Sequence, residues 1–190
     1  FFDIIKTEVL TPKKLSKISS KVMKEYAKKG NTTIVSAGIT AEDKRPFILF
    51  KHLSNNQITV LGGLLSKLNY LPKRRQNPRH FIYMRHDMAH LLPKKPNGGN
   101  DFYGIIGIKH WYDGSPYIGS MYLNEPYLNT ELSNNKLHIP KNHKGHALIE
   151  KDTLKSFIRS YHKNGWQIAL HTQGDAAISQ VIDIFDELAN

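Results

Sequence analysis

The sequence contains no cysteine, which excludes a disulfide framework, a thiolate metal site and a cysteine nucleophile. It also lacks any apolar run near the roughly 18 residues that a membrane-spanning helix needs, so no membrane partner is expected. Neither a Gly-x-Gly-x-x-Gly fingerprint nor a Gly-Lys-Ser/Thr phosphate loop occurs, and no two histidines are separated by a single residue. These absences leave no sign of a zinc finger or of a common phosphate-loop nucleotide binder.

Positive charge is what the chain has in excess. Its 190 residues include 27 Lys and Arg against 16 Asp and Glu, a formal net charge of +11 in an otherwise average globular composition. Residues 13–29 hold seven lysines, whose helical spacing opposite apolar residues is typical of an amphipathic helix with a solvated face. Residues 67–95 hold eight Lys or Arg and keep an alternative open, a non-catalytic basic module that binds nucleic acid. That segment lacks the regular aromatic residues of a base-stacking surface, so nucleic acid is not the expected partner.

Both ends of the sequence suggest a piece of a longer polypeptide. The chain begins Phe1-Phe2 without an initiator methionine or a targeting signal, and the helix expected from Asp175 reaches Asn190 without a Gly or Pro stop. The compartment is therefore unknown, with a slight preference for the cytoplasm. We expect residues 1–190 to form one central fragment of a larger domain.

Helix and strand patterns alternate along the chain. The periodicity predicts helices over residues 11–29, 41–53, 81–91, 151–164 and from 175 onward. Short apolar runs predict strands over residues 32–36, 57–65, 102–111 and 166–171. A long basic connection is expected at 66–100 and a loop at 113–149. This alternation predicts an α/β fold with a parallel sheet and helices outside it.

Two polar residues stand at the ends of apolar strands, where sites are built in parallel α/β folds. Lys109 follows Ile105–Ile108, and His171 follows Ile168–Leu170. A lysine in such a place is costly unless it is paired or used chemically. From spacing alone two interpretations stay open: a functional pair, or a Lys109 ion-paired to Asp113 with a His171 hydrogen-bonded in its loop.

Three sequence blocks around these residues resemble the amidohydrolase superfamily, in the YtcJ-like branch that includes N-substituted formamide deformylases. Residues 107–115 (GIKHWYDGS) are similar to its Lys-x-x-x-Asp-Gly-Ser signature. Residues 125–127 (EPY) are similar to the Glu-Pro-Tyr that follows in that branch, and residues 165–177 (GWQIALHTQGDAA) to its Gly-…-His-x-x-Gly-Asp-x-Ala unit. The order and spacing of the blocks match those of the family.

The resemblance implies a (β/α)8 barrel, of which this chain would supply about strands 2–5 with their outer helices. It implies one or two divalent metals, with zinc expected, and assigns Lys109 and His171 as catalytic metal ligands, Lys109 after possible carboxylation by carbon dioxide. A buried lysine amine favours the uncharged form that reacts with carbon dioxide, and metals acidify bound water and polarise a carbonyl. The implied activity is hydrolysis of an amide-like C–N bond in a small molecule. Asp113 and Asp175 are expected to be structural: Asp113 begins a turn, and Asp175 caps a helix.

The family's other ligands have no counterpart in this chain. The resemblance implies a His-x-His after strand 1, a histidine after strand 6 and an aspartate after strand 8, and none of these is present. We therefore expect this polypeptide alone to be inactive and to bind metal weakly. An incomplete barrel also exposes two sheet edges, so we expect self-association.

Other histidines offer weaker metal motifs. His86 and His90 stand four residues apart and resemble the His-Glu-x-x-His of zinc proteases with Asp in place of Glu, but no third ligand follows at a known spacing. Our preferred interpretation is a surface helix near the barrel mouth. His138, His143 and His146 fall in a polar loop, where solvated histidines are the common case.

Overall fold

The computed structural model describes residues 11–41, 43–54, 60–69, 77–96 and 100–189. It divides into two compact units, residues 1–106 and 107–190, which are described separately below. The elements of the first unit are α2 (Pro12–Lys28), β1 (Thr33–Ile39), α3 (Arg45–Ser54), α4 (Val60–Lys67), β2 (Arg79–Arg85) and η2 (His86–Leu91). Strand β3 (Tyr103–Trp111) begins in this unit, and the second unit continues with η3 (Pro116–Ile118), η4 (Glu131–Lys136), α5 (Lys151–His162), β4 (Gln167–His171) and α6 (Asp175–Ala189).

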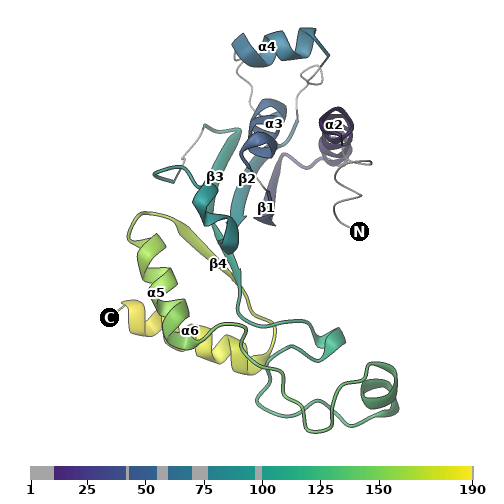
Figure 1. The fold of residues 1–190 in the computed structure, drawn as a ribbon, viewed down its shortest axis with the longest axis vertical. Helices are drawn as coiled ribbons and strands as arrows, with labels where there is room; N and C mark the ends of the chain where they lie inside the picture. The colour runs from purple at the N-terminus through teal and green to yellow at the C-terminus, as the bar shows by residue number, and fades with distance from the viewer. Residues whose placement is uncertain (1–10, 42, 55–59, 70–76, 97–99, 190) are drawn as a thin grey trace. The chain divides into compact units, whose positions relative to one another are not determined.

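The strands form a four-stranded sheet in the order β1-β2-β3-β4 (Figure 1). Strand β1 pairs in parallel with β2 from Thr33↔Arg79 onward, and β3 pairs in parallel with β4 from Gly107↔Gln167 to Trp111↔His171. Sequence-adjacent parallel neighbours require a crossover between each pair, and helices supply it. The α/β fold with a parallel sheet is as expected for part of a (β/α)8 barrel.

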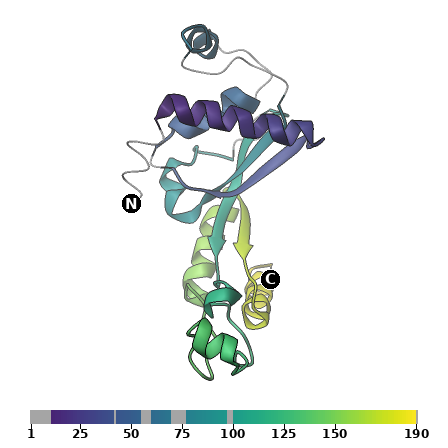
Figure 2. The same ribbon diagram turned by 90° about the vertical axis from the view of Figure 1, so that its right-hand side faces the viewer.

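The first unit packs two helices on one side of its strands. Helix α2 begins after Thr11, whose hydroxyl accepts a hydrogen bond from the Lys14 N–H at 3.4 Å. Its Met23 meets Leu49 and Leu53 of α3 in a small buried cluster against which Ile34 of β1 packs. Figure 2 shows the ribbons of α2 and α3 next to each other in this unit. The lysine-rich face of α2 is exposed, as its spacing predicts.

Two secondary-structure predictions in this unit are wrong. Residues 60–65 belong to helix α4 and not to a strand, while residues 57–59 lie outside the described residues. Leucine favours a helix, and the run is too short for its periodicity to decide between helix and strand. The helix predicted over 81–91 is instead strand β2 followed by the 3-10 helix η2. Residues 79–85 alternate between buried and less buried side chains, which is the period of two of a strand. The basic connection at 66–100 thus contains a strand.

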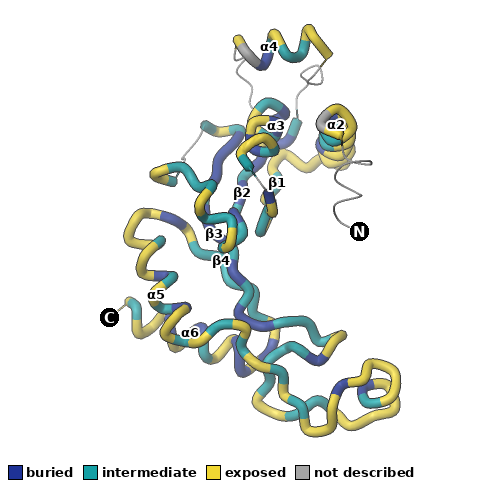
Figure 3. Tube along the Cα trace, in the orientation of Figure 1, coloured by how far each residue is buried: buried dark blue, intermediate teal, exposed yellow. Residues whose placement is uncertain are grey.

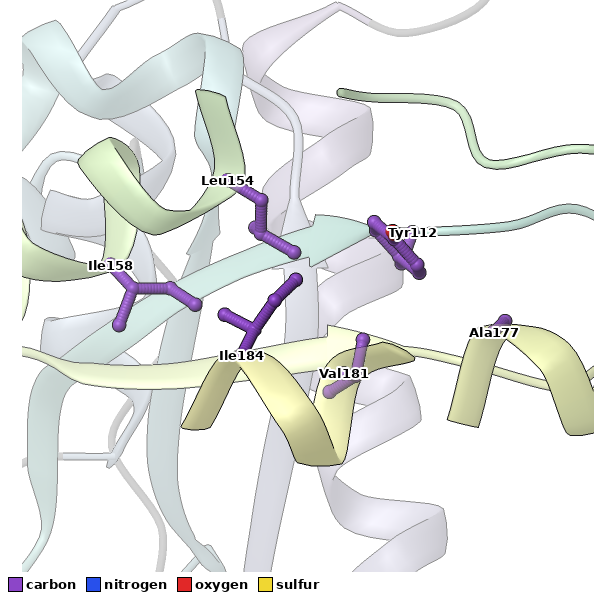
Figure 4. Close-up of a cluster of buried hydrophobic side chains, with 6 residues drawn as sticks. All are labelled: Tyr112, Leu154, Ile158, Ala177, Val181 and Ile184. Atoms are coloured by element: carbon purple, nitrogen blue, oxygen red, sulfur yellow. The ribbon is translucent and has the colours of Figure 1, made fainter. Parts of the chain in front are cut away.

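A core of apolar side chains holds the second unit together. Tyr112, Leu154, Ile158, Ala177, Val181 and Ile184 form this cluster, with Ile168 and Leu170 of β4 packed against it (Figure 4). Helix α5 and helix α6 therefore cover one face of the β3–β4 pair. Both helices were predicted from their apolar periodicity, and each ends within two residues of the predicted position or runs to the end of the described chain.

The stretch from 113 to 149 is a loop, as predicted, with only the short helices η3 and η4 inside it. Figure 3 shows that most of its outer part is exposed. Internal hydrogen bonds nevertheless order it: the Ser133 hydroxyl donates to the Leu128 carbonyl at 2.5 Å, and the Asn134 amide donates to the Ile139 carbonyl at 2.9 Å. Across the described residues of both units, no helix is long and apolar enough to cross a membrane.

Candidate functional site

The candidate site begins with the register of β3 against β4 in the second unit. Lys109 pairs with Ala169, and Trp111 pairs with His171. Side chains two residues apart on a strand share a face, and paired residues of parallel neighbours point to the same side. Lys109, Trp111 and His171 therefore lie on one face, with Lys109 and His171 on a diagonal of about 8 Å from the strand rise and spacing.

This face is the one that α5 and α6 do not cover. The alternate residues face the helices: Ile108 is fully buried, and the His110 ring meets Phe157 of α5 edge-on at 5.4 Å between ring centroids. In a (β/α)8 barrel the helix-free face is the barrel interior, and the carboxyl ends of its strands form the mouth. His171 is the last residue of β4, and Lys109 lies two residues before the end of β3.

The environment of Lys109 favours its neutral amine. The side chain is partly buried, and this burial lowers the pKa of the ammonium below its ordinary value. Its Nζ lies 5.5 Å from the centroid of the Trp111 ring, a cation–π contact that acts in the opposite direction and stabilises the charged form. No ion pair joins Lys109 to a described carboxylate, so the alternative of a Lys109–Asp113 pair is not observed.

The His171 imidazole is half-buried and has no hydrogen-bond partner among the described residues. Its backbone carbonyl accepts the Tyr112 N–H at 2.9 Å, which is the last rung between the two strands. The alternative of a His171 ring bonded in its loop is therefore not observed either. Within the part of the chain that the structure describes, no hydrogen bond engages either ring nitrogen.

Asp113 is fully buried and accepts three backbone N–H groups. Its Oδ1 accepts from Gln173 at 2.9 Å, and its Oδ2 accepts from Tyr122 at 3.0 Å and from Gly174 at 2.8 Å. All three donors belong to the loops that follow β3 and β4. Sequence reasoning expected a simple turn residue and did not find these contacts, because two of them join positions about sixty apart in the chain and the third joins positions nine apart.

Asp175 is the exposed counterpart of Asp113. It begins α6, and its carboxylate accepts the Asn124 N–H at 3.0 Å and the Ala176 N–H at 2.8 Å. The hydrogen bond from the Asn124 backbone is the main reason that its pKa lies below the ordinary value. Asp175 is thus structural and lies at the helix start, but it is the first residue of α6 and not its cap: the Gly174 carbonyl accepts the first helical hydrogen bond, from the Ile178 N–H.

The remaining histidines do not form a metal site among the residues that the structure describes. His86 and His90 lie on a 3-10 helix, which turns three residues per turn, so residues four apart do not share a face. His143 stacks on Tyr127 with ring centroids 6.3 Å apart. No group of three or more His, Asp or Glu side chains that could hold a metal ion occurs in the described part of the chain.

The basic segment at 67–95 shows no described patch for phosphates. Arg85 is ion-paired with Asp87, which uses its charge locally. Lys73, Arg74 and Arg75 lie outside the described residues. Nucleic-acid binding thus stays a prediction without a structural observation in its favour.

Comparison with known proteins identifies relatives of this arrangement. A profile of the Amidohydrolase family matches residues 2–190. A crystal structure of an uncharacterized metal-dependent hydrolase from Pyrococcus horikoshii OT3 aligns with a TM-score of 0.66 and 18% identity, over 98% of this chain and 33% of that one. A second, from Pyrococcus furiosus, aligns with a TM-score of 0.65 and 20% identity, over 97% of this chain and 34% of that one. No curated protein matches this chain. The chain spans about a third of the length of the solved structures that it matches.

Proposed function

This chain belongs to the amidohydrolase family, and from that premise we propose that it is the central part of a metal-dependent hydrolase that cleaves an amide-like C–N bond in a small molecule. The sequence blocks at 107–115 and 165–177 favour the YtcJ-like branch within the family. The observation that carries the proposal is the placement of Lys109 and His171 on the helix-free face, at the ends of neighbouring parallel strands.

The donors on this face fit a divalent cation. An unpartnered imidazole and an amine whose pKa is lowered by burial are both able to offer a nitrogen lone pair. Imidazole suits zinc, and we propose zinc as the metal. When bound, such an ion supplies Lewis acidity that polarises a carbonyl and acidifies water.

The residues of this chain have distinct proposed roles. His171 binds the cation through a ring nitrogen. In its neutral form the Lys109 amine would bind the cation directly, or would add to the carbon of carbon dioxide and lose a proton, which would give a carbamate anion with two oxygen donors. Trp111 lies beside the Lys109 amine, with the ring centroid 5.5 Å from Nζ, and is proposed to hold this side chain on the helix-free face.

The proposed ligand set is incomplete within these 190 residues. Two donors hold a zinc ion weakly, because structural and catalytic zinc sites use three or four protein ligands. We therefore propose that the activity requires the rest of the barrel and that this chain alone does not turn over substrate. The substrate contacts would come in part from the loop at 113–149 and in part from the missing strands.

Zinc titration tests the site directly. In the intact chain, Zn²⁺ is expected to shift the imidazole NMR signals of His171 before those of the exposed His138, and Lys109→Met is expected to weaken this response. A titration in which His138 or His146 responds while His171 does not would contradict the assignment.

A substrate screen tests the incompleteness. N-formyl and N-acyl amines incubated with the chain and excess zinc or manganese are expected to hydrolyse at the buffer rate. Turnover above that rate that disappears in His171→Asn would show that the chain is a complete enzyme and would overturn this part of the proposal.

A further inference from the structure

The hydrogen-bonded ladder between β3 and β4 ends at the candidate ligands. Its register stops at Trp111↔His171, and the Tyr112 N–H to His171 carbonyl bond is its last rung. Strand ends fray when nothing follows the last rung, because each end hydrogen bond opens with little loss of packing. Lys109 and His171 stand within this terminal part of the ladder.

The Asp113 carboxylate continues the connection beyond the last rung. Asp113 lies four residues after Lys109. Its carboxylate oxygens accept hydrogen bonds from the backbone N–H groups of Gln173 and Gly174, which lie two and three residues after His171. A third donor, Tyr122, comes from the returning part of the long loop. One carboxylate thus ties together the segments that follow both ligands.

Because Asp113 is buried, losing any of its hydrogen bonds is costly. Asp113 has no exposed surface, and among the described residues no cation pairs with it, so the three N–H donors alone compensate its charge. A buried carboxylate that loses such donors becomes costly, which penalises any displacement of either loop. The close approach of Gly174 to the Tyr122 carbonyl leaves no room for a side chain at this point.

We propose that Asp113 is a positioning residue for the candidate site: by holding the loops after β3 and β4, its carboxylate fixes the spacing and orientation of Lys109 and His171. This inference rests on the proposed function, because the spacing of the two side chains matters only if they act together on one ligand. It concerns a residue that touches neither the cation nor the substrate.

Asp113→Asn is the discriminating variant. An amide offers one acceptor oxygen. At the Oδ2 position this oxygen keeps the hydrogen bonds from the Tyr122 and Gly174 N–H groups, while the NH₂ group faces the Gln173 N–H, a second donor, so that hydrogen bond is lost. Amide hydrogen exchange at Gln173 is expected to accelerate at least tenfold, while the ladder amides in β4 keep their protection. The NMR signals of the His171 ring and of the Lys109 Cε are expected to shift, and zinc binding at His171 is expected to weaken about tenfold.

Asp175→Asn is the matched control, because it alters a neighbouring carboxylate that also accepts backbone N–H groups but is exposed to water. It is expected to leave the His171 and Lys109 signals in place. If Asp113→Asn accelerates exchange at Gln173 yet leaves the His171 and Lys109 signals and zinc binding unchanged, Asp113 only holds loops and the positioning role is overturned.

The readouts separate this inference from the proposed function. If the unmodified chain shows no zinc response at His171 while Asp113→Asn still moves the His171 and Lys109 signals, the positioning role stands and the metal proposal fails. Should the variant not fold, the unmodified protein still tests the claim: scalar couplings are expected across the hydrogen bonds from Tyr122, Gln173 and Gly174 to the Asp113 carboxylate carbon. Their absence overturns the proposal.

Discussion

His80 is a deeply buried ionisable side chain of the first unit and has no charged partner among the described residues. It is 3% exposed, its Nε2 lies 2.8 Å from the Ser36 hydroxyl, and its Nδ1 has no described hydrogen-bond partner. The rings of Phe50 and Tyr103 contact it edge-on. Burial lowers its pKa to about 4, so the ring is neutral in the folded unit.

This burial predicts a loss of stability in mild acid. An unfolded histidine takes up a proton near pH 6.5, and the folded His80 does so only near pH 4. As the pH falls between these values, protonation therefore stabilises the unfolded state relative to the folded state. The cost reaches about 3 kcal/mol at pH 4 and is absent above pH 7. Urea unfolding at pH 7.0 and 4.5 is expected to show a smaller pH dependence for His80→Phe than for the unmodified chain.

The exposed His138 provides the control for this experiment. His138→Asn suits the positive φ of that position and is expected to keep the full pH dependence. If the free energy of unfolding falls by the same amount from pH 7.0 to 4.5 in His80→Phe and in the unmodified chain, another group causes the acid sensitivity.

Gly174 carries a second prediction at this scale. A Cβ at this position would overlap the Tyr122 backbone, including its carbonyl oxygen, and backbone cannot rotate away as a side chain can. Gly174→Ala is therefore expected to lower the free energy of unfolding by about 1–3 kcal/mol, as overpacking does. Gln173→Ala, an exposed neighbour that keeps its N–H, is expected to change it by less than about 0.5 kcal/mol. Thermal unfolding monitored by circular dichroism measures both, and equal effects would contradict the steric argument.

The roles of single residues were predictable from sequence in part. Lys109 and His171 stand at strand ends in recognisable motifs, so position and residue type pointed to them. The contact of Lys109 with Trp111 follows from strand periodicity and was missed. The hydrogen bonds of Asp113 join it to Gln173 and Gly174, and no local pattern reports a contact at that separation.

At the scale of elements, long amphipathic helices were predicted well and short segments poorly. Helix α5 runs over Lys151–His162, close to the predicted 151–164, because its apolar residues repeat over three turns. Helix α4 has eight residues and strand β2 has seven, and each was assigned to the wrong class. Runs of this length satisfy both periodicities, and tertiary packing decides between them.

Helix α5 supplies the prediction at this scale. Leu154 is fully buried between Ile158, Ile184 and Tyr112 in the core of the second unit. Leu154→Ala removes this packing and is expected to cost about 2–5 kcal/mol of unfolding free energy. The neighbouring Thr153 is exposed, and Thr153→Ala is expected to change little. Urea denaturation followed by tryptophan fluorescence distinguishes the two, and a cost below about 1 kcal/mol for Leu154→Ala would show that the core is loosely packed.

At the scale of the whole molecule, the sheet has two edges and the chain carries a net charge of +11. Strand β1 is one edge, and its Val35 is 54% exposed. An exposed apolar edge strand pairs readily with another chain, whereas like charges oppose association until salt screens them. These features favour self-association at ordinary ionic strength.

Sedimentation velocity at about 0.15 M salt tests this tendency, since the screening length there is about 8 Å. The unmodified chain is expected to form dimers or larger species at micromolar concentration. Val35→Lys is expected to shift it toward monomer, because a charge on an edge strand disfavours pairing. Val60→Lys adds the same charge on helix α4, away from the sheet edge, and is expected to leave association unchanged. A compact monomer of the unmodified chain, or equal effects of both variants, would count against pairing through β1.

The anchoring of the loop at 113–149 has an evolutionary consequence. Both ends of this loop are anchored, one by the hydrogen bond between Tyr122 and Asp113 and the other where Gly145 approaches the Met121 carbonyl. The residues between Leu128 and Leu137 are mostly exposed to solvent. Insertions, deletions or grafted peptides in that span leave the anchored ends of the loop unchanged. Selection can therefore remodel the part of the loop that reaches outward without disturbing the anchored strand ends that carry Lys109 and His171.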